Sequence, residues 1–271
     1  MKDLLNDLRN LVDFPLRQLF RWRRKGLVFQ NQSKDHLYSF LSSADRQKAE
    51  EKTTRYVQEY HLDYLYNHSS RSNFCENLFY IEMLEQGLSC CSFLPKESIC
   101  VGDIGVSTWF YVQGYYHFLR FWKTDHPRTV HLSGYEIDPY RVMPNFYSRY
   151  DHAVAHIGPN QEIQFVPAGF FPQPDRFDLL TMFFPFVFVN DHLEWGLPHT
   201  CFSPGALLKS AWLSVKTGGV LFVVNQGEAE HRAYHKLMMD LSINPEAGFR
   251  FDSLFYLYAE PRYILVALKH G

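Results

Sequence analysis

A group of small residues and one acid could bind a ligand largely through backbone atoms. An apolar run over 99–101 is followed by Asp103, Gly105 and Ser107, and then by a long aromatic and aliphatic stretch over 108–122. This order indicates a buried strand, a tight turn and a helix, which together present backbone N–H groups to a ligand at the helix N-terminus. Small residues at such a junction also occur for steric reasons alone, so the motif needs support from its neighbours.

Short apolar runs alternate with helical patterns from about residue 95 onward, which is typical of a mostly parallel α/β sheet. The predicted strands and helices alternate along the chain, with a polar loop before the third helix. We predict strands over 99–104, 129–137, 162–166, 177–182 and 220–224, helices over 107–122, 140–155, 204–215 and 229–241, and the loop over 190–203. The last two apolar runs, 250–258 and 262–268, predict an antiparallel hairpin.

The first part of the chain predicts helices. Leucines recur at helical spacing from Leu4, and we expect Pro15 to break that helix or to start a new one. The cations over 21–25 complement a helix C-terminus that Gly26 ends, although together with Trp22 they could instead bind phosphate. This part therefore predicts at least one helix with a basic end.

Capping signals divide the rest of this helical part. Ser42 begins a capping box that opens a long charged helix. Ser72 or Asn73 caps a later helix that closes at Gly87. We predict a helical N-terminal region over 1–93, acting as a lid or substrate wall, and an α/β domain over 94–271.

Bulk composition narrows the classes of partner. The formal net charge of −2 provides no global attraction to nucleic acid or to an anionic membrane. Five cysteines without zinc spacing indicate reduced thiols, and the N-terminus has no signal-peptide pattern, so we expect a cytoplasmic protein. The longest apolar run, 183–189, is too short to span a bilayer. The histidine pairs 152/156 and 231/235 have no evident third ligand, so we expect no metal site, and the sequence leaves the oligomeric state open.

The ordered set of motifs resembles the class I S-adenosylmethionine-dependent methyltransferase superfamily over roughly residues 95–271. The matching segments are the glycine loop, the ends of the second and fourth strands, and the helix and turn before the fifth. They read Asp103-Ile-Gly105-Val-Ser107, Gly134-Tyr-Glu136-Ile-Asp138-Pro139, Phe177-Asp178-Leu-Leu, and the run from Leu207 to Leu221 with Gly218-Gly219. The terminal hairpin also matches.

The resemblance implies a Rossmann-like methyltransferase sheet, mostly parallel with a terminal antiparallel hairpin, preceded by the helical N-terminal region. It implies S-adenosylmethionine as cofactor. The residues it assigns to the cofactor are Asp103, Gly105, Ser107, Glu136, Ile137, Phe170 and Phe183. Asp103 would face the ammonium group through water, and Glu136 would accept both ribose hydroxyls. Phe170 would be an apolar neighbour of the adenine.

The loop departs from the family pattern in two positions. Ser107 replaces the second glycine and Trp109 replaces the third. The serine hydroxyl can substitute for a backbone contact, whereas Trp109 either packs beneath the loop or crowds the site. The intact Asp103, Gly105 and Glu136 favour cofactor binding, and the two replacements favour its loss.

The segment after the fourth predicted strand bears on the acceptor. Phe183-Phe184-Pro185-Phe186 stands where amino-methylating members have Asn/Asp-Pro-Pro-Tyr, which argues against a nucleobase amine. These aromatic residues could flank a flat or apolar acceptor, or they could simply fill the core. If the acceptor is a hydroxyl or a thiol, a base that removes its proton would help the reaction. His192 is a weak candidate for that base, and the alternative is that it is a solvated histidine in a loop.

Two functions therefore remain open. The first is methyl transfer from S-adenosylmethionine to a small, partly apolar or aromatic acceptor. In this function we expect neither nucleic acid nor a membrane as a partner. The second is a catalytically silent relative that serves as a binding or scaffold module. A nicotinamide-dependent oxidoreductase is disfavoured because no Gly-x-Gly-x-x-Gly follows the first predicted strand.

Overall fold

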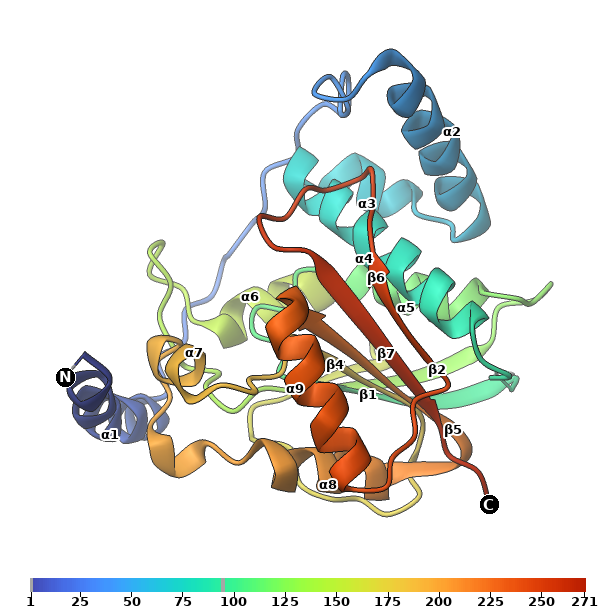
Figure 1. The fold of residues 1–271 in the computed structure, drawn as a ribbon. Helices are drawn as coiled ribbons and strands as arrows, with labels where there is room; N and C mark the ends of the chain where they lie inside the picture. The colour runs from blue at the N-terminus through green and yellow to red at the C-terminus, as the bar shows by residue number, and fades with distance from the viewer. Residues whose placement is uncertain (1, 94–95) are drawn as a thin grey trace.

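The computed structural model describes residues 2–93 and 96–271. These residues form a seven-stranded sheet with helices on both faces (Figure 1). The strands are β1 (Ser98–Ile104), β2 (Thr129–Tyr135), β3 (Ile163–Val166), β4 (Phe177–Phe183), β5 (Val215–Gln226), β6 (Ala247–Phe251) and β7 (Arg262–Leu268). Their order across the sheet is β3-β2-β1-β4-β5-β7-β6. Strands β1 to β5 are parallel and β7 is antiparallel to both of its neighbours, which confirms the predicted fold class.

The centre of the sheet is apolar because helices cover both of its faces. All residues of β4 are buried, as expected for a parallel strand between two helical layers. The edge strand β6, in contrast, alternates between more and less exposed residues. Continuous burial therefore distinguishes the central strand β4 from the edge strand β6.

The helices divide between the two faces. They are α1 (Lys2–Phe20), α2 (Ser43–Glu59), α3 (Asp63–His68), α4 (Arg71–Ser89), α5 (Val112–Phe121), α6 (Arg149–Ile157), α7 (Val189–Glu194), α8 (Pro204–Ser214) and α9 (Gly227–Asp240), with a 3-10 turn, η1, at His199–Cys201. One hydrophobic cluster joins the sheet to α2, α4 and α5. A second joins the opposite face to α8 and α9 (Figure 1). No helix of the described ranges is both long and apolar enough to cross a membrane.

Helices from the first 93 residues thus share a core with the sheet. The predicted division at 93/94 falls beside residues 94–95, which lie outside the described residues. The division into a helical region and an α/β domain stays a prediction.

Three expectations for the N-terminal helices are wrong. Pro15 lies inside one continuous helix, α1, which ends at Phe20 rather than at Gly26. Pro15 removes one hydrogen bond of the helix. Tertiary hydrogen bonds stabilise α1 both before and after Pro15. The Asn10 amide donates to two carbonyl oxygens near α7, at 2.8 and 3.0 Å, and Arg17 donates to the Gly196 carbonyl at 2.7 Å.

The cap of α4 is also not the predicted one. Ser70 caps this helix by accepting from the Asn73 backbone N–H, so Ser72 and Asn73 lie within its first turn. The predicted cap of α2, Ser42, is confirmed. Both helices therefore begin at a serine, as cap statistics favour.

Two helices of the α/β part begin later than predicted. Helix α5 starts at Val112 because Ser107 and Trp109 adopt left-handed backbone angles, with φ of 52° and 50°. Helix α6 starts at Arg149, after a capping box made by Ser148. The predicted polar loop over 190–203 contains α7 and η1. The extra loop residues lie at the carboxyl edge of the sheet.

We predict that Gly87→Ala destabilises the fold although alanine favours helix. A Cβ at Gly87 would lie 2.3 Å from the buried ring of Phe222, where α4 crosses β5. Overpacking of this kind costs about 1–3 kcal/mol, which urea unfolding would measure. The matched control is Gly205→Ala in α8, where the nearest atom would lie at 3.6 Å, and it should leave stability unchanged or slightly raised. Equal stability of both variants would contradict this packing.

Candidate functional site

Five predicted cofactor residues come together at the adjacent carboxyl ends of β1 and β2. The two strands pair in parallel, and beyond β1 the Gly105 N–H donates to the Tyr135 carbonyl at 2.8 Å. Asp103, Gly105 and Ser107 come from the first strand and its turn, and Glu136 and Ile137 follow the second. The strand order reverses between β1 and β4, which is where open α/β sheets bind ligands.

Asp103 is fully buried and accepts three hydrogen bonds. The donors are Trp109 Nε1 at 2.9 Å, Tyr111 Oη at 2.8 Å and Thr181 Oγ1 at 2.7 Å. Thr181 lies directly across from Asp103 in the pairing of β1 with β4. Burial raises the pKa of Asp103 to about 7, although the three hydrogen bonds act in the opposite direction. Asp103 thus accepts hydrogen bonds from two residues that follow the turn after β1, and these bonds fix the loop over the buried carboxyl group.

Trp109 packs beneath the loop, which decides between the two alternatives for this residue. Its ring is fully buried and lies against Gly134, where a Cβ would come within 2.5 Å of it. The ring of Phe165, on β3, is 6.4 Å away. Glycine at 134 is therefore required by the close approach of the indole to β2.

The carboxylate of Glu136 is buried and has protein donors at both oxygens. The Ser107 backbone N–H donates to Oε2 at 2.8 Å. The Asp138 N–H donates to Oε1 at 2.8 Å, and Arg149 Nη1 lies 3.3 Å from the same oxygen. The turn after β1 and the acid after β2 are thus joined directly.

A cluster of arginines surrounds these acids. Asp138 is fully buried and pairs with Arg17 of α1, whose Nε lies 2.9 Å from Oδ1. Arg149 Nη1 lies 3.9 Å from Oδ2 of the same carboxylate. The guanidinium carbon of Arg149 lies 4.5 Å from the centre of the Trp195 ring. Burial, followed by the nearby Arg149 and Arg17, lowers the pKa of Arg141.

Sequence reasoning missed this cluster. Arg17 lies 121 positions before Asp138, and no spacing links the two. Arg149 follows the helix cap Ser148, but its position gave no sign that it would pair with Glu136. The polar Thr181, which with Asp178 interrupts the apolar residues of β4, was the available signal of a partner for a buried acid.

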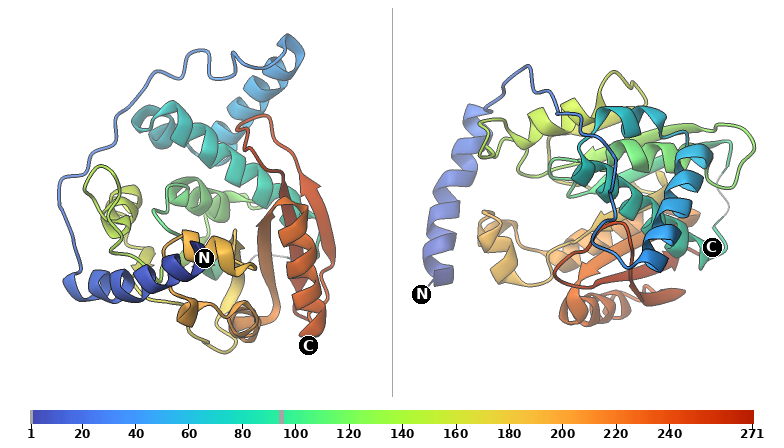
Figure 2. Two further views of the ribbon diagram at one scale, coloured as in Figure 1. Left: turned by 60° about the vertical axis from the view of Figure 1, so that its left-hand side comes forward. Right: turned by 90° about the horizontal axis from the view of Figure 1, so that it is seen from above.

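Helix α1 lies beside this edge of the sheet. Gln18 donates to the Ile137 carbonyl at 3.1 Å, and α1 also contacts α7. Figure 2 shows α1 along one margin of the molecule. An N-terminal helix therefore borders the end of β2.

The apolar residues predicted for the cofactor lie in different environments. Ile137 is half-buried, and a Cβ at Gly169 would lie 3.5 Å from it. Phe170 packs against Tyr135, with ring centroids 5.0 Å apart, in the cluster on the α8 side. Phe183 is buried in the aromatic cluster on the opposite face. The structure thus does not bring Phe170 and Phe183 together.

His192 is buried in α7 and is not a solvated loop residue, so that alternative is wrong. Its Nε2 lies 3.0 Å from the Pro198 carbonyl oxygen, and its ring contacts those of Phe186 and Phe202. Burial lowers the pKa of His192, which keeps the imidazole neutral near pH 7. Its action as a base stays a prediction.

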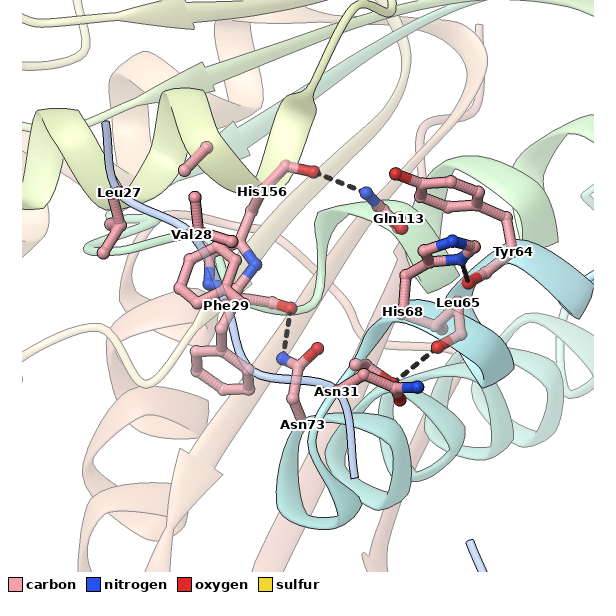
Figure 3. A pocket seen from close by; sticks show the side chains of 13 residues that line it. Leu27, Val28, Phe29, Asn31, Tyr64, Leu65, His68, Asn73, Gln113 and His156 are labelled. Carbon is pink, nitrogen blue, oxygen red and sulfur yellow. Dashed lines mark hydrogen bonds between the residues drawn. The ribbon is translucent and has the colours of Figure 1, made fainter. Parts of the chain in front are cut away.

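A cavity of about 270 Å³ lies outside this cluster, between the 27–31 segment and helices α3, α5 and α6 (Figure 3). Phe29 stacks on His156 at 3.9 Å, and Gln113 donates to the His156 carbonyl. Burial lowers the pKa of His156 to about 3, so its ring is neutral. The lining contains two histidines, His68 and His156, but no carboxylate, lysine or arginine, and it does not include Asp103 or Glu136. Within residues 2–93 and 96–271, no group of three or more potential metal ligands occurs.

We predict that Asp103→Asn removes a pH dependence of stability. The raised pKa means that the folded state holds a proton that the unfolded state, with an ordinary value of 3.8, releases. This contribution to stability is complete below about pH 4 and is lost as the pH rises to about 7, by at most about 1.4 kcal/mol per pH unit. A protonated Asp103 can donate to Thr181 Oγ1 if the hydroxyl then donates to the Gly102 carbonyl, 3.3 Å away, in place of Asp103. Asparagine can make the same bond through its amide N–H and can accept from Trp109 and Tyr111.

Urea unfolding of both proteins between pH 4 and pH 8 measures the difference. The stability of Asp103→Asn relative to the wild type should increase with pH. Asp252→Asn, at an exposed carboxylate after β6, is the control and should follow the wild type. A difference between Asp103→Asn and the wild type that does not vary with pH would contradict a proton on Asp103.

Comparison with known proteins supports the fold. No family model matches the sequence, and no curated protein matches it. A putative class I S-adenosylmethionine-dependent methyltransferase from Listeria monocytogenes aligns with 99% of this chain and 87% of its own, with a TM-score of 0.52 and 12% identity. A methyltransferase from Aquifex aeolicus aligns with 70% of this chain and 90% of its own, with a TM-score of 0.45 and 14% identity. The alignment with the Listeria structure and the strand order show that the chain has the Rossmann-like fold of class I S-adenosylmethionine-dependent methyltransferases.

Proposed function

We propose that the chain binds S-adenosylmethionine at the carboxyl ends of β1 and β2 and transfers its methyl group to a small acceptor. One observation carries the proposal. The Ser107 N–H lies 2.8 Å from the Glu136 carboxylate, at the edge where the strand order reverses. This contact brings a backbone turn and a ribose-type acid together at the ligand-binding edge of the sheet.

The residues at this edge fit the nucleoside part of the cofactor. Gly105 is exposed, has φ of 80°, and would have no atom within 4 Å of a Cβ, so a ligand can approach its backbone. Glu136 has two acceptor oxygens for two neighbouring hydroxyls. Ile137 and Gly169 offer small apolar surface beyond it. We propose that the Ser107 N–H moves away from Glu136 when the ribose binds, which frees Oε2 for a hydroxyl.

The cofactor supplies a methyl group on a positively charged sulfur. The task of the chain is to hold the acceptor in line with that group, which is the main source of rate in such a displacement. Phe184 and Phe186 are half-buried after β4 and can offer aromatic faces to a partly apolar acceptor. His192 lies beside Phe186, with ring centroids 5.7 Å apart, and is the candidate base for a hydroxyl or thiol acceptor.

The alternative is a catalytically silent binding or scaffold module. The hydrogen bonds of Glu136 favour this alternative, because protein donors already occupy both of its oxygens. One of these donors is the guanidinium group of Arg149. If these contacts persist in solution, three donors occupy three of the roughly four lone-pair sites of the carboxylate, so Glu136 cannot accept both ribose hydroxyls. The two functions differ in whether the Ser107–Glu136 contact opens.

We predict that isothermal titration calorimetry with S-adenosylhomocysteine, the demethylated product, detects binding to the wild type. Glu136→Gln should weaken that binding by about 10- to 100-fold, because hydrogen bonds to a charged acceptor contribute about 1.5–3 kcal/mol. Glu97→Gln makes the same chemical change at an exposed residue before the amino end of β1 and should leave the affinity unchanged.

Two results would contradict the proposal. Absence of heat at millimolar ligand, with the wild type folded by circular dichroism, would favour the silent module. Binding that Glu136→Gln leaves unchanged would place the ligand away from the end of β2.

A further inference from the structure

Helix α1 presents its apolar face to solvent. Its exposed large apolar side chains range from 41% to 75% relative accessibility: Leu4, Leu5, Leu8, Leu11, Val12, Leu16, Leu19 and Phe20. They recur at three- and four-residue spacing and so form one stripe along the helix. We refer to these eight residues as the α1 stripe.

The opposite, polar side of α1 is the side that contacts the rest of the chain. Asn10 is buried and donates to carbonyl oxygens of Leu193 and Leu197. Arg17 pairs with Asp138, and Gln18 donates to the Ile137 carbonyl. A surface helix usually buries its apolar face and exposes its polar one. This reversed orientation means that burial of the α1 stripe contributes nothing to the docking of α1 on its own chain.

The α1 stripe is large enough for a stable protein interface. The fractional exposures of its side chains correspond to roughly 900 Å² of apolar surface, beyond the largest patch of a typical monomer. In a standard interface each partner buries about 800 Å². We infer that the α1 stripe binds the α1 stripe of a second copy of this chain.

The arrangement of the α1 stripe is self-complementary. An antiparallel pair with its two-fold axis near Val12 places Leu8 opposite Leu16 of the second copy. The same axis places Leu4 opposite Phe20. Apolar side chains then face each other along the whole helix, as an isologous contact requires.

Charges beside the α1 stripe favour a second copy over an anionic membrane. The helix has equal numbers of acidic and basic side chains, and Arg9 and Asp13 pair at 3.0 Å along one edge. The antiparallel arrangement brings this edge against its own reversed copy, so Arg9 of one chain approaches Asp13 of the other. Membrane-surface helices instead carry an excess of Lys and Arg on their polar face.

The basic segment after α1 is also turned toward the protein. Arg23 lies over the Tyr150 ring at 4.0 Å and donates to the Tyr140 hydroxyl. Arg24 lies over the Tyr147 ring at 4.7 Å. These guanidinium groups are engaged by the loop and first turn around α6, which weakens any role as lipid headgroup contacts.

Sedimentation velocity of the full chain over a micromolar concentration range tests the inference. The wild type should sediment as a dimer with about twice the 32.0 kDa chain mass. Leu8→Glu and Leu16→Glu should each halve the mass while leaving the circular dichroism spectrum unchanged. The control Leu257→Glu, at a side chain with 66% exposure before β7, should remain dimeric.

A cysteine at the axis gives an independent readout. Val12→Cys should form a disulfide-linked dimer on mild oxidation, whereas Leu19→Cys, far from the axis, should not. The wild type, with its exposed Cys90, reports the background. A monomeric wild type, or a dimer that survives Leu8→Glu, would overturn the inference. A monomer that pellets with vesicles of phosphatidylcholine and phosphatidylserine, and loses this binding in Leu8→Glu, would overturn it in favour of a membrane surface.

Discussion

The carboxyl group of Asp103, buried at the end of β1, determines the shape of the candidate site. It accepts from Trp109, Tyr111 and Thr181, and so joins the loop after β1 to the neighbouring strand β4. An uncompensated acid in this position would be costly, because burial penalises its charged form. The loop therefore folds back over Asp103 with Trp109 inside. That arrangement leaves the Ser107 N–H directed at Glu136.

A second set of contacts extends from Glu136 to the N-terminal helix. Arg149 lies between Glu136 and Asp138, and Arg17 of α1 pairs with Asp138. Buried ion pairs often add little net stability, but removing one partner leaves a costly unpaired charge. We interpret these pairs as fixing where α1 docks, since its apolar face makes no such contact. The helix is in this way coupled to the candidate site.

The sequence predicted the sheet and the meeting of Asp103, Gly105 and Glu136, because periodicity and strand ends are local signals. It did not predict the partners of Asp103, because they depend on the register that sets Thr181 opposite it. The position of Trp109 stayed open for the same reason, since the space above Gly134 exists only after β1 and β2 pair. Pro15 was misread because a single lost hydrogen bond was weighed without the tertiary contacts of α1. The docking of Arg17 on Asp138 has no local signature.

In the proposed function, the Ser107–Glu136 contact closes the site and opens for the cofactor. A crystal structure with S-adenosylhomocysteine tests it most directly. We expect the ribose hydroxyls within hydrogen-bond distance of both Glu136 oxygens, with the Ser107 N–H moved away and Trp109 still bonded to Asp103. A bound ligand with the Ser107–Glu136 contact intact would show that the cofactor binds without opening this contact.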